Sequence, residues 1–279
     1  MSITGATLLI IIAANIIISY KGFTNQAFFD QYKFHVDKIL IKKEYWRLIT
    51  SSFLHIGWAH LILNMYSLFL FAGSIEEYLG GLKFLIIYFA GMIGGDLLTL
   101  FIHRNHGDYS SVGASGAVCG IIFSAIALFP GMSVGMFLVP ISFPGWLYGL
   151  LYVLFSIYGI KSKRDNANHA AHLGGTIIGM LVALIMEPSA IKENYFAILI
   201  IIIPTLIFIG ITVINPSVLS LDNFFHHAKD DYSIDHKYNA ERNYRRKEID
   251  RILDKINKHG MGSLSQKERV LLEEYSKKI

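Results

Sequence analysis

Seven apolar stretches, separated by polar or glycine- and proline-containing segments, constrain this chain more than any other feature. A helix needs about 20 residues to cross the hydrocarbon core of a bilayer, within a range of about 17 to 25. The second, fourth and fifth stretches are short, which is typical of helices surrounded by protein. The sequence therefore predicts an all-α membrane protein with about seven transmembrane helices, at Ile3–Tyr20, Ala59–Gly73, Lys83–His103, Ser115–Phe129, Trp146–Ile160, His169–Met186 and Tyr195–Ile214.

The composition supports a membrane protein and divides the chain in two. Of the 279 residues, 53% are hydrophobic and only 16% are charged, which is too apolar for an ordinary soluble domain of this length. About half of the charges follow Asp222, so we expect a transmembrane domain over residues 1–214 and a soluble charged helical tail over residues 215–279. The tail mixes both signs of charge and the net charge is only +4, so no nucleic-acid partner is expected. Cys119 is the only cysteine, which excludes an intrachain disulfide.

The tail carries its own helical pattern. Ser265 and Glu268 have the spacing of a capping box that opens a helix, and Gly260 is placed to end the helix before it. A solvated helical hairpin without a catalytic role is the expected structure. The apolar residues that recur at helical spacing in its first helix are Ile249, Ile252, Leu253 and Ile256.

Two connecting segments differ from simple turns. Residues 21–58 mix lysines with aromatic residues, a combination typical of the membrane interface. Residues 131–145 contain no charge and two prolines, Pro140 and Pro144. We expect this second segment to dip into the headgroup region or to pack on the helix bundle.

Four polar residues lie inside or at the ends of the apolar stretches, where an ionisable group costs about 2.5–3.5 kcal/mol on insertion scales. His60 and Asn64 are four residues apart and so share one face at the start of the second stretch. Ser115 opens the fourth stretch, and His172 lies about one turn into the sixth. The second, fourth and sixth helices run in the same direction, so these four residues are predicted to share one depth and one side of the membrane.

Glycines indicate how the serine and the histidine are brought together. Gly113 and Gly116 flank Ser115 and leave its backbone open to a neighbouring chain. Small residues four apart let membrane helices approach closely. We expect the sixth helix to pack its small residues against the fourth and to bring His172 within hydrogen-bond range of Ser115; the facing glycine pairs are Gly175 with Gly179 and Gly116 with Gly120.

This arrangement predicts nucleophilic catalysis. Ser115 is the expected nucleophile, and His172 the general base that removes its proton and later protonates the leaving amine. Asn64, His60 and the backbone N–H of Ser115 are the expected donors to the oxyanion. Asp96 is the only acidic residue at a suitable depth to orient His172, although a polar contact inside the bundle explains Asp96 equally well.

Other chemistry is less favoured. No HExxH motif or paired carboxylate–histidine spacing accompanies the histidines, so we expect neither a metal nor a cofactor. Cys119 is interpreted as a small apolar side chain. A proton-coupled transporter that uses Asp96 is disfavoured because no internal repeat is visible. The histidines that a zinc site would need are His55, His60, His169 and His172.

Four motifs, in order, resemble the rhomboid family of intramembrane serine proteases over about Trp46 to Met186. They are Trp46-Arg47-Leu48-Ile49-Thr50 with Phe53-Leu54-His55 and His60-Leu61-Ile62-Leu63-Asn64-Met65, Glu76 with Gly80 and Lys83-Phe84-Leu85, the GxSG motif Gly113-Ala114-Ser115-Gly116, and Ala171-His172-Leu173-Gly174-Gly175.

The resemblance implies a six-helix core with one helix added at its C-terminal end, a Ser115–His172 dyad, and an oxyanion hole formed by His60, Asn64 and the Ser115 amide. It also implies single-pass transmembrane proteins as substrates, and the inner membrane of a bacterium as the location. Arg47 is expected to support the first loop. An inactive relative that binds transmembrane helices without cutting them is the alternative, and the oligomeric state stays open.

The two arguments about orientation disagree. The resemblance implies that the site faces outward and that the lysine-rich residues 21–58 lie on the same outer side. The excess of Lys and Arg in short loops instead predicts that this side faces the cytoplasm.

Overall fold

The computed structural model of this chain describes residues 5–135, 142–162 and 167–214, together with residues 252, 255, 256, 264, 265 and 268. Contacts divide the chain into two compact units, Met1–Asn223 and Phe224–Ile279.

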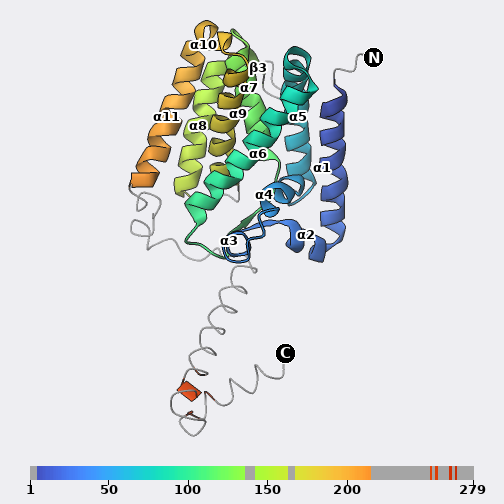
Figure 1. The fold of residues 1–279 in the computed structure, drawn as a ribbon, viewed down its shortest axis with the longest axis vertical. Coiled ribbons are helices and arrows are strands. Elements are labelled where there is room, and N and C mark those ends of the chain that lie inside the picture. Colours follow the sequence, from blue (N-terminus) through green and yellow to red (C-terminus); the bar gives the residue numbers. More distant parts are fainter. Residues whose placement is uncertain are drawn as a thin grey trace. The chain divides into compact units, whose positions relative to one another are not determined.

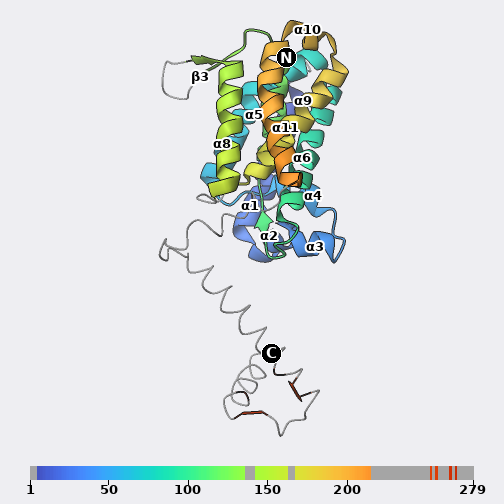
Figure 2. The same cartoon turned by 90° about the vertical axis from the view of Figure 1, so that its left-hand side faces the viewer.

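The first unit is a bundle of long helices that stand side by side (Figures 1 and 2). Among the described residues, five helices are long and apolar enough to cross a membrane: α1 (Ala6–Thr24), α5 (Trp58–Leu79), α6 (Gly81–His103), α9 (His169–Met186) and α11 (Tyr195–Ile214). Two further helices match predicted stretches, the short apolar α7 (Ser115–Leu128) and α8 (Gly145–Ser162). The all-α membrane fold is thus confirmed, whereas seven crossings stay a prediction.

The prediction of a short second helix is wrong. α5 has 22 residues and continues past Gly73 to Leu79. Its last turns are helical although they carry acidic residues, because the carboxylate of Glu76 is buried and accepts the backbone N–H groups of Thr7 (3.0 Å) and Leu8 (3.1 Å). Glu76 therefore satisfies donors at the start of α1 that have no partner within that helix.

Residues 25–57 fold into a compact segment at one end of the bundle (Figure 1). Its strand β1 pairs in antiparallel fashion with β2 (Ser110–Ser111), and its core consists of Phe34, Val36 and Ile39. The sequence predicted an interfacial segment here but not this internal structure. The elements are α2 (Gln26–Tyr32), β1 (Phe34–His35), α3 (Val36–Leu40), α4 (Arg47–Thr50) and the 3-10 turn η1 (Ser51–Phe53).

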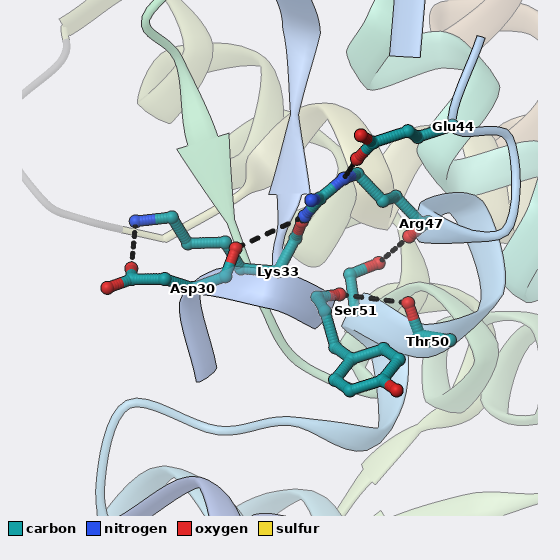
Figure 3. A network of polar contacts seen from close by, with 7 residues as sticks. Asp30, Lys33, Glu44, Arg47, Thr50 and Ser51 are labelled. Carbon is teal, nitrogen blue, oxygen red and sulfur yellow. Dashed lines mark hydrogen bonds and ion pairs between the residues drawn. The ribbon is translucent and has the colours of Figure 1, made fainter. Parts of the chain in front are cut away.

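Arg47 joins the parts of this segment, as the resemblance implied (Figure 3). Its Nε donates to Glu44 at 2.6 Å, and its Nη1 donates to the backbone oxygens of Lys33 (2.6 Å) and Asp30 (3.3 Å). The Arg47 side chain is 3% exposed, so these bonds satisfy a charged group that is nearly removed from water. The segment is consequently held as one piece against the bundle.

Two further connections are structured. The segment after α7 contains the antiparallel pair of β3 (Ser133–Gly135) and β4 (Ser142–Pro144), next to the start of α8 (Figure 2). This strand pair was not predicted. The short helix α10 (Ser189–Glu193) joins α9 to α11, and α11 continues through Pro204 as one helix.

Helix α7 is buried on all sides, as expected for a short helix surrounded by protein. Every residue of α7 after Ser115 is buried. Its main neighbours are α6 and α9, and three glycines allow the close approach: a Cβ on Gly120 would lie 3.1 Å from the Cα of Gly91 in α6 and 3.5 Å from the Cα of Gly179 in α9. The core of the bundle therefore lies around the helix that begins at Ser115.

The described residues of the second unit confirm the predicted capping box. Ser265 N donates to Glu268 at 2.8 Å, and Glu268 N donates to Ser265 Oγ at 3.3 Å. These bonds hold the pKa of the Glu268 carboxyl at about 2, with the backbone N–H of Ser265 as the largest cause. Ile252 is buried, whereas Ile249, Leu253 and Gly260 lie outside the described residues.

Candidate active site

Helices α7 and α9 cross at the two glycine pairs that the sequence indicated. A Cβ built on Gly175 would lie 3.0 Å from the Cα of Gly116, and a Cβ built on Gly179 would lie 2.7 Å from the carbonyl oxygen of Gly120. Neither position has room for a larger residue, because the obstructing atoms belong to backbone. The predicted close crossing of these helices is confirmed.

This crossing brings the turns of Ser115 and His172 together. A Cβ on Gly116 would lie 3.3 Å from the carbonyl oxygen of Ala171, so the residues next to Ser115 and His172 are in backbone contact. Both Ser115 and His172 are partly exposed, whereas Gly116 and Ala171 are buried. The two side chains thus lie at the edge of the core.

His60 and Asn64 lie beside the turn that precedes Ser115. Gly113 in this turn has φ 132°, a conformation that glycine tolerates and other residues rarely adopt. A Cβ on Gly113 would lie 2.7 Å from Cε1 and 3.0 Å from Nε2 of the His60 ring, so the ring is packed on this turn. Asn64 is buried and donates one amide hydrogen to the backbone oxygen of His60 at 2.9 Å. Three of the predicted residues are therefore neighbours here.

The same turn is held by the segment around η1. Gly113 N donates to the backbone oxygen of Ser51 at 3.1 Å, and Ala114 N donates to Nε2 of His55 at 3.4 Å. These two bonds fix the two residues that precede Ser115. The sequence analysis placed His55 in a family motif and among possible metal ligands but gave it no role at this turn, and it did not consider Ser51.

The hydrogen bonds of His55 define its protonation. Nε2 accepts from Ala114, so the ring proton lies on Nδ1 and is donated to Ser19 Oγ at 2.9 Å; Ser19 in turn donates to the backbone oxygen of Phe53 at 2.9 Å. The chain of bonds joins α1 to the turn before Ser115 and requires a neutral ring. Burial, together with the nearby His60, lowers the pKa of His55 to about 3.

Asp96 of α6 bonds to Ser51. The Oγ of Ser51 lies 3.0 Å from Asp96 Oδ2 and 2.6 Å from the backbone oxygen of Arg47. Of the two explanations for Asp96, a polar contact inside the bundle is therefore the one observed. Ser51 connects this buried carboxyl to the Gly113 turn through its own backbone oxygen.

Asn168 fixes the start of α9, one turn before His172. Its Oδ1 accepts from Ala171 N (3.1 Å) and from Thr99 Oγ1 (3.0 Å), and its Nδ2 donates to Ser111 Oγ at 3.1 Å. The backbone oxygen of Asn168 accepts the N–H of His172 at 3.2 Å. Sequence reasoning missed Asn168, although an asparagine directly before an apolar helix is a common N-cap and is a usable signal.

The four histidines that a zinc site would need form two ring pairs. The rings of His55 and His60 are 4.9 Å apart, and those of His169 and His172 are 5.4 Å apart. Within the described residues, no group of three His, Cys, Asp or Glu side chains is arranged to hold a metal ion.

Comparison with known proteins gives two family matches. Residues 42–189 match the rhomboid domain, and residues 232–278 match a family of unknown function (DUF6576).

Similar proteins come from bacteria and from mitochondria. YdcA of Bacillus subtilis is 34% identical over 148 residues, which are 51% of this chain and 67% of YdcA. Rhomboid protein 1, mitochondrial, of Saccharomyces cerevisiae is 29% identical over 163 residues, 56% of this chain and 47% of that protein. The rhomboid protease GluP of Bacillus subtilis is 30% identical over 147 residues, 53% of this chain and 27% of GluP. The chain thus spans about half or less of the yeast protein and of GluP, and two thirds of YdcA.

Proposed function

This chain belongs to the rhomboid family, and from that premise we propose that it is an intramembrane serine endopeptidase. The chain is a multi-pass integral membrane protein, so its substrate bonds are expected to lie in or near the bilayer. The observation that carries the proposal is the backbone contact between Gly116 and Ala171, which joins the turns of Ser115 and His172.

In the proposed reaction, His172 takes the proton of Ser115 Oγ while that oxygen attacks the peptide carbonyl. The tetrahedral intermediate collapses to an acyl-enzyme when His172 returns the proton to the leaving amine. A water molecule, deprotonated by His172, then hydrolyses the ester and releases Ser115. Two residues suffice for these steps because the start of α9, fixed by Asn168, holds the base in place.

Three donors are proposed to stabilise the oxyanion. The backbone N–H of Ser115 lies at the start of α7, where the N–H groups of a helix have no partner within it. The His60 ring lies against the Gly113 turn, and Asn64 has a second amide hydrogen besides the one bonded to His60. In comparable sites the loss of one such donor costs about 2.7–4 kcal/mol in the transition state.

Substrate, location and domain roles belong to the same proposal. The proposed substrates are single-pass transmembrane proteins, because rhomboid proteins act on transmembrane substrates within the lipid bilayer. The sequence suggested the inner membrane of a bacterium; relatives include mitochondrial proteins as well as those of Bacillus subtilis. We propose that residues 1–214 are the protease domain and residues 215–279 a soluble tail.

The test is labelling of the purified full-length protein with a fluorophosphonate, together with cleavage of a single-pass transmembrane substrate. Ser115→Ala and His172→Ala are expected to lose both labelling and cleavage. Ser124→Ala is the matched control, because Ser124 is a buried serine of the same helix that bonds to the backbone oxygen of Gly120.

Two results would contradict the proposal. Cleavage that persists in Ser115→Ala excludes Ser115 as nucleophile. A wild-type protein that binds transmembrane helices but is neither labelled nor active supports the alternative, an inactive member of the family.

A further inference from the structure

Tyr152 of α8 occupies a position between three helices. Its ring centroid lies 5.7 Å from that of His172 in α9 and 5.7 Å from that of Phe123 in α7. Its hydroxyl lies 3.2 Å from Cys119 Sγ, also in α7. Cys119 follows Ser115 by four residues, so both lie on one face of α7. One tyrosine thus contacts the helix of the nucleophile and the side chain of the base.

The Tyr152 side chain is fixed on several sides. The buried Cys119 thiol holds the hydroxyl, and Phe123 packs against the ring edge at an interplanar angle of 61°. Tyr148, one turn earlier in α8, stacks on Tyr152 at 6.0 Å. Tyr152 is half-buried, and its hydroxyl has the Cys119 thiol as a hydrogen-bond partner.

Helix α8 itself is packed closely at both of its ends. A Cβ on Gly149 would lie 2.7 Å from Cδ1 of Ile201 in α11, and a Cβ on Gly159 would lie 2.6 Å from Cγ of the His169 ring in α9. His169 packs on His172 at 5.4 Å. His172 therefore contacts Tyr152 of α8 directly, and it also contacts His169, whose ring packs against Gly159 of α8.

We propose that Tyr152, anchored by Cys119, is the positioning residue that orients the His172 imidazole toward Ser115. This role rests on the proposed function, in which His172 is the base. Tyr152 does not touch the substrate or take part in proton transfer; it restricts the rotation of the imidazole. A misplacement of about 1 Å at a catalytic group can cost about a hundredfold in rate.

The kinetic test separates the ring of Tyr152 from its hydroxyl. Tyr152→Leu removes the ring and is expected to lower kcat about tenfold to a hundredfold with KM unchanged within about twofold. Tyr152→Phe keeps the ring and is expected to rescue kcat to within about fivefold of wild type. Tyr158→Leu is the matched control, a tyrosine of the same helix that is 54% exposed. Equal losses in Tyr152→Phe and Tyr152→Leu would overturn the role of the ring.

A double-mutant cycle tests the anchor with conservative changes. Cys119→Ala and Tyr152→Phe remove the same bond, so the double variant is expected to be no slower than the slower single variant. Losses that multiply would show that Cys119 does not act through Tyr152.

A spectroscopic measurement separates this inference from the proposed function. In protein with isotope-labelled histidine and tyrosine, a nuclear Overhauser effect between the Tyr152 and His172 rings is expected, with His172→Ala used to assign the signal. Its absence from the wild-type protein would overturn the inference. If the wild type shows the nuclear Overhauser effect but is not labelled by the fluorophosphonate, the proposed function is contradicted. The contact between Tyr152 and His172 is then still supported.

Discussion

At the scale of the residue, the turn before Ser115 depends on groups that must stay uncharged. His55 makes one hydrogen bond with each ring nitrogen, as acceptor for Ala114 and as donor to Ser19. A protonated ring has no acceptor, so it loses the bond to Ala114. The serine of the GxSG motif is therefore attached to α1 by a chain of bonds that is sensitive to acid.

The pH dependence of stability follows from the His55 ring. An unfolded histidine takes up a proton below its ordinary pKa of about 6.5, whereas folded His55 stays neutral down to its pKa of about 3. The contribution of His55 is thus fully present above pH 6.5 and is lost as the pH falls toward 3, by at most about 1.4 kcal/mol per pH unit. Thermal unfolding of wild type and His55→Gln is expected to show a difference in Tm that shrinks between pH 7 and pH 5.

The His55→Gln comparison controls for the other titrating groups, which both proteins share. A difference in Tm that is constant over this pH range would mean that His55 does not titrate between the folded and unfolded states.

The hydroxyl of Ser51 has two oxygen neighbours but only one hydrogen to donate. A hydroxyl has one hydrogen, and the 2.6 Å contact with the Arg47 carbonyl requires it, since a carbonyl oxygen only accepts. The 3.0 Å contact with Asp96 is then a full hydrogen bond when the carboxyl of Asp96 carries the proton. The Ser51 hydroxyl thus gives the buried Asp96 carboxyl a polar partner within an apolar helix.

At the scale of the element, backbone contacts between glycines define the crossing of α7 and α9. The relevant distances join a prospective Cβ to backbone atoms, which cannot rotate away as a side chain can. Small residues on both helices are therefore a requirement of this crossing and not merely a preference.

Gly179→Ala is expected to lower both stability and activity, because its Cβ would lie 2.7 Å from the Gly120 carbonyl oxygen and the helices would have to separate. Overpacking of this kind typically costs about 1–3 kcal/mol. Gly73→Ala in α5 is the matched control: its Cβ meets nothing within 4 Å, and alanine in a helix is favoured over glycine by about 0.5–1 kcal/mol. Unfolding midpoints and fluorophosphonate labelling rates measure both effects. A Gly179→Ala protein as stable as Gly73→Ala would contradict the close crossing.

The elements also mark what was predictable from sequence. The α7 and α9 glycine pairs were predicted because they repeat at helical spacing within each stretch. The end of α5 was missed because Glu76 reads as a polar loop residue, and only its distant partners Thr7 and Leu8 make it a buried cap. Tyr152 was missed for the same reason. The spacing of residues within one apolar stretch does not show which residues of other helices a tyrosine will contact.

At the scale of the whole molecule, the candidate site and the lysine-rich residues 21–58 lie at the same end of the bundle (Figure 1). Helices α5, α7 and α9 begin at this end of the bundle, and helices α1, α6, α8 and α11 end there (Figure 1). The candidate site and the lysine-rich residues 21–58 are therefore expected to face the same side of the membrane.

Topology reporters give the test. A reporter fused to Ile279 and a label on a cysteine introduced at exposed Lys42 are expected to respond on the same side of the membrane, since α11 ends at the end of the bundle that carries residues 21–58. A cytoplasmic signal from both would follow the distribution of Lys and Arg, and an external signal from both would follow the family resemblance. Signals on opposite sides would contradict the seven-crossing arrangement.

The cap of α1 has a consequence for how the protein is made. The N–H groups of Thr7 and Leu8 bond to a carboxylate 69 and 68 residues later in the chain, and Asn15 bonds to the Tyr88 hydroxyl 73 residues later. The residues of α1 are therefore synthesised before either partner. The hydrogen bonds that α1 makes to Glu76 and Tyr88 can form only after the residues of α5 and α6 that supply them have been made.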